Sequence, residues 1–240
     1  ENNVAQRDAI LWERLSAAGA VLLGKTNTSE FGMAAFTSNE LGDACGNPFD
    51  PGRIAGGSSG GAGSAVAAGL GPIAHGTDGG GSVRIPAAYN GVVGFKPTVG
   101  LVSRTHIVPI SRSQDTAGPM ARTVTDAAIL LGALEGAEPD RNDPTTSRCD
   151  PPVNGDYTAF LRADGLQGAR IGIPRALYYD SVSVPGSDTP QNRLSEEGRA
   201  VMAEAIDILR EQGATIVDPA DIPSIVDPDP THNLLASSGS

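Results

Sequence analysis

The sequence predicts an α/β protein. Amphipathic helical stretches alternate with short apolar runs of strand length along the 240 residues, which is the pattern that α/β folds produce. The chain is 39% hydrophobic and 19% charged, so it can build one substantial core or two modest ones. Because aromatic residues make up only 4% of the chain, that core must come mainly from Ala, Val, Leu and Ile.

The first predicted elements are a helix at residues 4–18 and a strand at residues 20–23. The helix follows from apolar side chains at helical spacing, and Gly19 suits the position just past its end. The run AVLL after it predicts a short buried strand. Residues 37–57 hold Gly, Asn, Pro and Asp at turn spacing and predict a long loop.

Three further helical segments and several strands are predicted before residue 137. A helix of small residues is expected at 59–70, packed closely against its neighbours. The segment SVRIPAAYNG predicts a turn of helix that Pro86 stops. A clear helix covers residues 123–134, with Thr123 or Thr125 as its N-cap. The remaining apolar runs predict strands at residues 71–77, 91–95, 100–103 and 106–110.

The composition changes after residue 137. Residues 138–157 are rich in Pro, Asp, Asn and Thr, which predicts a linker or a long surface excursion. Beyond it the sequence predicts a strand at 169–174, a helix at 195–212 and a strand at 214–218.

Charge and cysteine content exclude several classes of partner. A formal net charge of −11 argues against direct binding of nucleic acid, because phosphate contacts require Lys and Arg patches. Cys45 and Cys149 fit neither a disulfide scaffold nor a zinc cluster. No apolar run approaches the length that spans a membrane. We expect no membrane partner and favour a cytoplasmic location. The oligomeric state does not follow from the sequence.

Two glycine–serine clusters are the most distinctive feature of the chain. They are GGSSGG at Gly56–Gly61 and GGGS at Gly79–Ser82. Each is compatible with a simple turn, since Gly and Ser are common turn residues. A Walker phosphate loop is excluded because no Lys-Ser or Lys-Thr follows either cluster. A dinucleotide fingerprint can be fitted to Gly69, Gly71 and Ala74, but this segment follows a predicted helix rather than a strand, so the fingerprint is excluded as well.

A nucleophilic serine accounts for the second cluster better. Three glycines precede Ser82, and their N–H groups could point at one oxygen and form an oxyanion hole. Serine needs a base, but His75 lies in an apolar run, His106 follows a strand and His232 lies in the tail. A Ser-His-Asp triad is therefore disfavoured, and no G-x-S-x-G elbow surrounds the serine.

A lysine acting through a second serine is the remaining mechanism. Lysine is a base only when it is neutral, which requires desolvation or another cause of a lowered pKa. A relay serine needs unusual backbone geometry, and Gly57-Ser58 is a place for a strained or cis peptide bond. The chain contains only two lysines, Lys25 and Lys96.

The two clusters, read with their flanks, resemble the amidase signature family of Ser–cis-Ser–Lys amidohydrolases. The resemblance lies in GGSSGGAGSAVAAG, GTDGGGSVRIPA, the preceding LSAAGAVLLGKTNTSEF and the following NGVVGFKPTVGLVSRTHIVPISRSQDTAGPMARTVTDAAILLGAL. It covers residues 8–135 strongly. It implies a mixed central β-sheet surrounded by α-helices.

The resemblance also implies a role for each matching residue. Ser82 matches the acyl-forming nucleophile, and Ser58 matches the bridging serine in cis geometry. Ser59 matches a supporting hydrogen-bonding residue. Asp78 and Arg84 flank the nucleophile and could pair to brace its loop, or be purely structural. The oxyanion hole would consist of the N–H of the nucleophile and those of Gly79, Gly80 and Gly81.

The base lysine of the family does not carry over. In these proteins it lies on a strand before the segment that matches GAVLLGKTN. Lys25 matches the polar turn after the strand within that segment, and Lys96, in GFKPT, matches another family segment, where it is expected to brace a loop. The chain therefore resembles a piece truncated at both ends, with a partial amidase core at residues 1–137, an excursion or linker at 138–157, and a continuation at 158–240.

The resemblance implies cleavage of a carboxamide C–N bond through a serine acyl-enzyme, with a small-molecule amide as substrate and no metal or organic cofactor. The segment GLVSRTHIVPISRSQDTAGPM favours stand-alone amidases of the peptide-amidase and cyclic-amide hydrolase type. The alternatives are the A subunit of a glutamyl- or aspartyl-tRNA amidotransferase, and a non-catalytic fragment that lacks the base.

Overall fold

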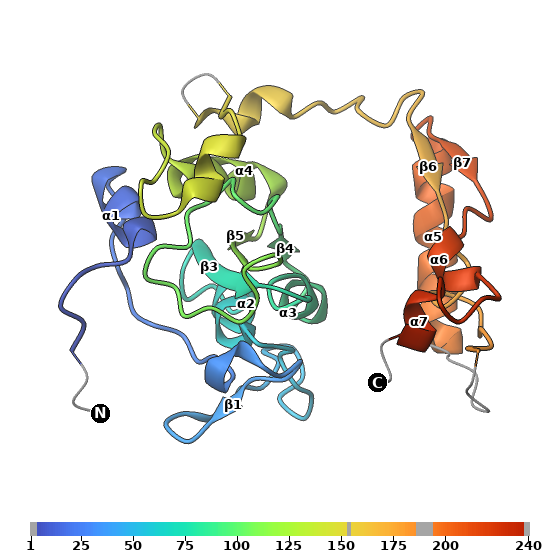
Figure 1. Ribbon diagram of the computed structural model, residues 1–240, viewed down its shortest axis with the longest axis horizontal. Helices are drawn as coiled ribbons and strands as arrows, with labels where there is room; N and C mark the ends of the chain where they lie inside the picture. The colour runs from blue at the N-terminus through green and yellow to red at the C-terminus, as the bar shows by residue number, and fades with distance from the viewer. Residues whose placement is uncertain (1–3, 153–154, 186–193, 238–240) are drawn as a thin grey trace. The chain divides into compact units, whose positions relative to one another are not determined.

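The described part of the chain forms two units, which divide between Leu161 and Arg162. The computed structural model describes residues 4–152, 155–185 and 194–237. Figure 1 shows helices and short strands in both units. The α/β class is confirmed, while the assignment of residues 1–137, 138–157 and 158–240 to separate parts stays a prediction.

A three-stranded antiparallel sheet in the order β3-β5-β4 lies at the centre of the first unit. The strands are β3 (Ile73–Asp78), β4 (Val93–Gly94) and β5 (Thr116–Ala121). All residues of β5 are buried, and its register pairs Asp78 with Thr116. The loop that carries Ser82 therefore begins where β3 ends, next to the start of β5.

The middle strand β5 is absent from the sequence-based predictions. Gly118 and Pro119 interrupt its apolar pattern, and proline is normally confined to edges and bulges of sheets. Here Pro119 contributes its carbonyl, which accepts the N–H of Phe95 at 3.1 Å. Glycine is needed before it, because a Cβ at residue 118 would lie 2.1 Å from the Phe95 carbonyl oxygen.

Helices cover this sheet and supply the two hydrophobic clusters of the first unit. They are α1 (Ile10–Ala17), α2 (Gly60–Ala67), α3 (Arg84–Tyr89) and α4 (Val124–Glu135). Helices α1 and α4 enclose one cluster, formed by Leu11, Leu15, Val102, Ala117, Leu130, Leu131 and Leu134. The other lies between α2, α3 and β5 and is formed by Ala62, Val83, Ala87 and Met120.

Close packing of the small-residue helix α2 is confirmed. A Cβ at Gly61 would lie 2.4 Å from the carbonyl oxygen of Asn27, and one at Gly63 would lie 3.0 Å from that of Pro86. The prediction that Pro86 ends α3 is wrong, because Pro86 lies inside this helix. It is the third helical residue, where a backbone N–H would have no intrahelical acceptor, so proline costs little there.

Three predicted strands are wrong. Residues 20–23 are irregular, with Val21 81% exposed, because no described strand pairs with them. Residues 100–103 turn instead, with the Leu101 N–H donating to the Thr98 carbonyl. In residues 106–110 the run is broken by His106, whose φ of 65° is left-handed.

The predicted long loop at 37–57 and the cap of the fourth helix are confirmed. The loop contains only the two-residue strands β1 (Ser38–Asn39) and β2 (Asp43–Ala44), preceded by the 3-10 turn η1 (Glu30–Gly32). The side chain of Thr123, rather than Thr125, accepts the Asp126 N–H and caps α4.

The described residues of the Pro- and Asp-rich stretch at 138–157 lie within the first unit. It contains η2 (Pro144–Arg148), and η4 (Tyr157–Phe160) begins at its end. The Tyr157 hydroxyl donates to Glu135 at 2.5 Å. Burial raises the pKa of Tyr157, as does the hydrogen bond to Glu135.

The second unit contains the strand–helix–strand arrangement that the sequence predicts. Strands β6 (Arg170–Gly172) and β7 (Thr215–Val217) pair in parallel, with α5 (Glu196–Glu211) between them in the sequence. The hydrophobic core of the second unit consists of Ile173, Tyr179 and Ile206. Two short helices follow, α6 (Pro223–Val226) and α7 (Leu234–Ser237). No helix in the described residues is long and apolar enough to cross a membrane.

Candidate active site

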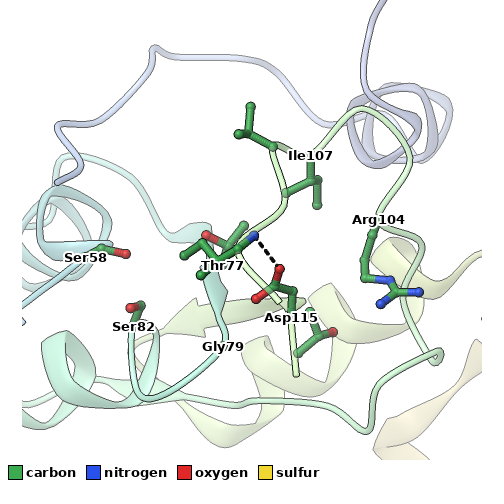
Figure 2. A pocket seen from close by; sticks show the side chains of 10 residues that line it. Ser58, Thr77, Gly79, Ser82, Arg104, Ile107 and Asp115 are labelled. Carbon is green, nitrogen blue, oxygen red and sulfur yellow. Dashed lines mark hydrogen bonds between the residues drawn. The ribbon is translucent and has the colours of Figure 1, made fainter. Parts of the chain in front are cut away.

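The two serine loops meet at one pocket in the first unit. Ser58 and Ser82 both line it, and Figure 2 shows them on one side with Asp115 across from them. The full lining is Ser58, Thr77, Gly79, Ser82, Arg104, Ile107, Val108, Ile110, Asp115 and Thr116. The structure thus places the two serines that the sequence singles out in the same site.

The Ser58 loop is held by residues from an earlier part of the chain. The Gly57–Ser58 peptide bond is cis, as predicted. The Ser29 N–H donates to the Ser58 carbonyl at 3.0 Å. The Thr37 hydroxyl lies 2.9 Å from the Gly56 carbonyl oxygen and 3.1 Å from that of Ser58, and it accepts the Gly60 N–H at 2.9 Å.

Ser59 connects the two loops. Its N–H donates to the carbonyl of Ser82 at 3.1 Å. Its hydroxyl accepts the Thr77 N–H at 3.2 Å and lies 3.3 Å from the Thr77 carbonyl oxygen. Because a Cβ at Gly76 would lie 2.4 Å from this hydroxyl, glycine at that position leaves room for the connection.

The Ser82 loop is held by its own flanking residues. The buried carboxylate of Asp78 accepts the N–H of Gly81 at 2.6 Å and that of Val83 at 3.0 Å. The Arg84 guanidinium donates to both carboxylate oxygens, at 3.1 and 3.2 Å. Burial by itself would raise the pKa of Asp78, but these hydrogen bonds outweigh it, and the pKa lies below its ordinary value.

Of the four backbone N–H groups from Gly79 to Ser82, one donates a hydrogen bond to a described residue and three do not. The Gly81 N–H is occupied by Asp78. No residue in the described ranges accepts the N–H groups of Gly79, Gly80 or Ser82. Gly81 has a φ of 137°, and a Cβ there would lie 2.6 Å from the Ile85 Cδ1 atom, so only glycine fits this bend.

Asp115 is a site residue that the sequence analysis missed. Its Oδ2 atom accepts the N–H groups of Ile110 and Ser111, each at 2.7 Å. Its Oδ1 atom is buried and has no hydrogen-bond partner among the described residues. The register of β3 and β5 would have located it: Asp78 pairs with Thr116, so Asp115 comes opposite Gly79. Without β5, that neighbour could not be predicted.

Arg104 forms part of the pocket wall and was also missed. It donates to the carboxylate of Asp143, with the shortest contacts at 2.8 Å, and to the Thr145 hydroxyl and the Arg112 carbonyl. The side chains of Arg104 and Asp143 are only 17% and 7% exposed. The Arg104 guanidinium holds the pKa of Asp143 well below its usual range.

No lysine or histidine lines the pocket in the part of the chain that the structure describes. Neither Lys25 nor Lys96 is placed beside the serines, and His75 and His106 lie outside the lining as well. The site as described therefore has two serines, a braced glycine loop and a carboxylate.

The comparisons with known proteins assign the family. A model of the family described as Amidase matches residues 1–230. The chain therefore belongs to the amidase family, as its sequence motifs predict.

The relatives include two kinds of protein. The A subunit of the glutamyl-tRNA(Gln) amidotransferase of Chloroflexus aurantiacus is 43% identical over 229 residues, which are 95% of this chain and 43% of the relative. The solved peptide amidase from Stenotrophomonas maltophilia is 42% identical with a TM-score of 0.75, over 89% of this chain and 42% of that one. The solved A subunit of the glutamyl-tRNA(Gln) amidotransferase from Thermotoga maritima is 37% identical with a TM-score of 0.79, over 93% of this chain and 45% of that one.

Proposed function

We propose that this chain carries the nucleophile and its relay in an enzyme that cleaves carboxamide C–N bonds. The chain spans 43% of the length of its Chloroflexus aurantiacus relative, so the activity proposed is that of the full-length protein. The observation that carries the proposal is the meeting of Ser82, at the end of a braced glycine loop, with Ser58 in one pocket. Family membership supports it.

The mechanism begins with attack by Ser82. Its Oγ forms a bond to the carbonyl carbon of the amide, and its proton passes through the Ser58 hydroxyl to a base. The carbonyl oxygen becomes an oxyanion, for which the free N–H groups of Gly79, Gly80 and Ser82 are the donors. We assign the base to the lysine that precedes the GAVLLGKTN segment in this family, because no lysine lines the described pocket.

The C–N bond then breaks as the nitrogen takes a proton back through Ser58 and leaves as ammonia or an amine. Water attacks the acyl-enzyme, gives its proton to the same relay and releases the carboxylic acid with Ser82 regenerated. Asp78 contributes by fixing the loop, since it holds the N–H groups on both sides of Ser82. No step requires a metal or an organic cofactor.

The test is hydrolysis of a panel of primary amides by the full-length protein and by its Ser82→Ala variant. We expect product acid and ammonia from the wild type, and loss of both in a variant that unfolds at an unchanged temperature. Retained turnover by the variant would exclude Ser82 as the nucleophile.

A second candidate is the A subunit of a tRNA-dependent amidotransferase. The 43% identity to the Chloroflexus aurantiacus protein favours it, whereas the 42% identity to the peptide amidase favours a stand-alone enzyme. Glutamine hydrolysis that appears only with partner subunits and charged tRNA would support the amidotransferase. Hydrolysis of amides by the isolated full-length protein would support the stand-alone enzyme, our first choice.

A non-catalytic protein is the third candidate, motivated by the absence of a lysine from the described pocket lining. A full-length protein that binds amides but releases no acid would establish it. A small-molecule amide is the ligand in all three cases. The cytoplasmic location stays a prediction.

A further inference from the structure

We propose that the free oxygen of Asp115 accepts a hydrogen bond from the leaving nitrogen of the substrate and thereby makes the site select amides over esters. The inference rests on the proposed function above. It assigns a substrate contact to a residue that the mechanism otherwise does not use.

The two oxygens of this carboxylate have different surroundings. Oδ2 accepts two backbone N–H groups, from Ile110 and Ser111, both at 2.7 Å. Oδ1 accepts none from the described residues, although Asp115 is only 9% exposed. A buried carboxylate oxygen without a donor is unfavourable for the folded state, and such groups are uncommon in proteins. Its retention next to a serine nucleophile points to a donor that arrives with the substrate.

The obvious cation in the pocket does not satisfy this oxygen. Arg104 lines the same pocket but directs its N–H groups to Asp143, Thr145 and the carbonyl of Arg112. Asp143 holds it at two points, so its guanidinium is committed to the pocket wall. Oδ1 of Asp115 therefore remains the unpaired acceptor of the described site.

The position of the oxygen matches the needs of a carboxamide. A Cβ at Gly79 would lie 2.7 Å from Oδ1, so the free acceptor lies directly beside the glycine loop with its free N–H donors. Ser82, Gly79 and Asp115 all line this pocket, and in the view of Figure 2 Gly79 lies between Ser82 and Asp115. Donors and an acceptor side by side are complementary to the C=O and N–H of one amide group.

The chemistry strengthens this contact during the reaction. As the tetrahedral intermediate collapses, the nitrogen receives a proton through the Ser58 relay, and positive charge develops on it. A neighbouring carboxylate stabilises that charge more than it stabilises the neutral amide, which is the condition for accelerating the step. The leaving oxygen of an ester has no N–H, so Oδ1 would face its lone pairs instead.

The variant Asp115→Asn tests this contact, because two backbone N–H groups fix the orientation of the asparagine side chain. Ile110 and Ser111 need an oxygen acceptor, so the asparagine carbonyl takes the Oδ2 position and its NH₂ takes the Oδ1 position. The loop keeps its anchor while the pocket exchanges an acceptor for a donor. In the full-length protein we expect kcat/KM for a primary amide to fall about 10–100-fold, since hydrogen bonds to charged groups have this effect. For the methyl ester of the same acyl group, we expect a change below about threefold.

Asp140→Asn is the matched control. Asp140 is about as buried, accepts the hydroxyls of Ser103 and Thr105, and does not line the pocket. It should leave the ratio of amide to ester hydrolysis unchanged. Equal losses for amide and ester in Asp115→Asn, an unchanged amide rate, or failure of that variant to fold would each overturn the proposal and make Asp115 a structural residue.

Binding separates this proposal from the proposed function. If the wild type hydrolyses no amide, the affinity of a primary amide is measured by calorimetry for Ser82→Ala and for Ser82→Ala with Asp115→Asn. A loss of about tenfold or more in the double variant would support the contact with the substrate nitrogen although the enzymatic proposal had failed. Equal affinities would overturn it.

Discussion

The two serine loops of the pocket are fixed in different ways. The Ser82 loop depends on Asp78, four residues away, and on Arg84, two residues away. The Ser58 loop depends on Ser29 and Thr37, which are 29 and 21 residues away. A local brace can be inferred from a sequence motif, whereas a long-range brace becomes visible only when the chain is folded.

The largest expected effect on kcat/KM comes from the different chemical roles of Ser82 and Ser58. Removing the nucleophile with Ser82→Ala should lower kcat/KM for amides by about 10⁴-fold or more, as in other enzymes with a serine nucleophile. Ser58→Ala leaves the nucleophile in place and removes only the proton relay, so we expect a loss of about 10²–10⁴. Amide hydrolysis by the full-length variants measures both. A larger loss for Ser58→Ala than for Ser82→Ala would reverse the assigned roles.

Within the local brace, the buried Asp78 should contribute more to stability than the half-exposed Arg84. Asp78→Ala leaves the N–H groups of Gly81 and Val83 without their acceptor, and we expect it to lower the free energy of unfolding by about 3 kcal/mol. Arg84 is half exposed, so Arg84→Ala should cost only about 1 kcal/mol. Urea unfolding distinguishes them, and equal losses would show that the guanidinium, not the backbone contacts, holds the loop.

The long-range brace is tested by Thr37→Val, which keeps the shape of the side chain and removes its hydroxyl. The Gly60 N–H then loses a buried acceptor, and we expect a loss of about 2 kcal/mol together with a lower kcat, because the Ser58 loop loosens. Thr158→Val is the control, since the hydroxyl of this threonine bonds only to nearby Asp156 at an exposed site. An unaffected kcat would mean that the Ser58 loop keeps its shape without Thr37.

The wall of the pocket adds a dependence on pH. The pKa of Asp143 is below its ordinary value of 3.8 because of Arg104. A depressed carboxyl pKa contributes stability that is complete above the unfolded value and is lost as the pH falls below it toward the folded value. Asp143→Asn should therefore destabilise the protein at neutral pH, with the difference from wild type shrinking as the pH falls from about 5 to about 3.

Thermal unfolding across that pH range measures the effect. Asp164→Asn removes an ion pair with Arg162 in which both side chains are about 70% exposed, and it should change the curve far less. A difference between wild type and Asp143→Asn that stays constant down to about pH 3 would exclude this origin of the pH dependence.

The sequence was sufficient for the features that depend on local pattern. The amphipathic helix that became α5, the Thr123 cap of α4 and the close packing of α2 follow from spacing and residue size. The cis bond before Ser58 was also predicted, from the need for unusual geometry at a relay serine. The apolar run at residues 20–23 was misleading, because strand formation depends on a partner as well as on composition.

The features that the sequence did not predict depend on pairing between distant segments of the chain. Strand β5 contains Gly118 and Pro119, which conceal it, and it is stable because β3 and β4 lie on either side. Missing β5 meant missing Asp115, which the register places opposite Gly79. Arg104 could not be assigned to the pocket wall because its partner Asp143 lies 39 residues away.

Covalent labelling of the full-length protein with a fluorophosphonate tests the central claim most directly. Ser58 and Ser82 lie on one tryptic peptide, residues 54–84, but cleavage before Asp78 separates them. We predict a single adduct on the fragment that begins at Asp78, located to Ser82 by mass spectrometry and absent from Ser82→Ala. An adduct on the Ser58 fragment, or labelling that persists in Ser82→Ala, would contradict the assignment of Ser82 as the nucleophile.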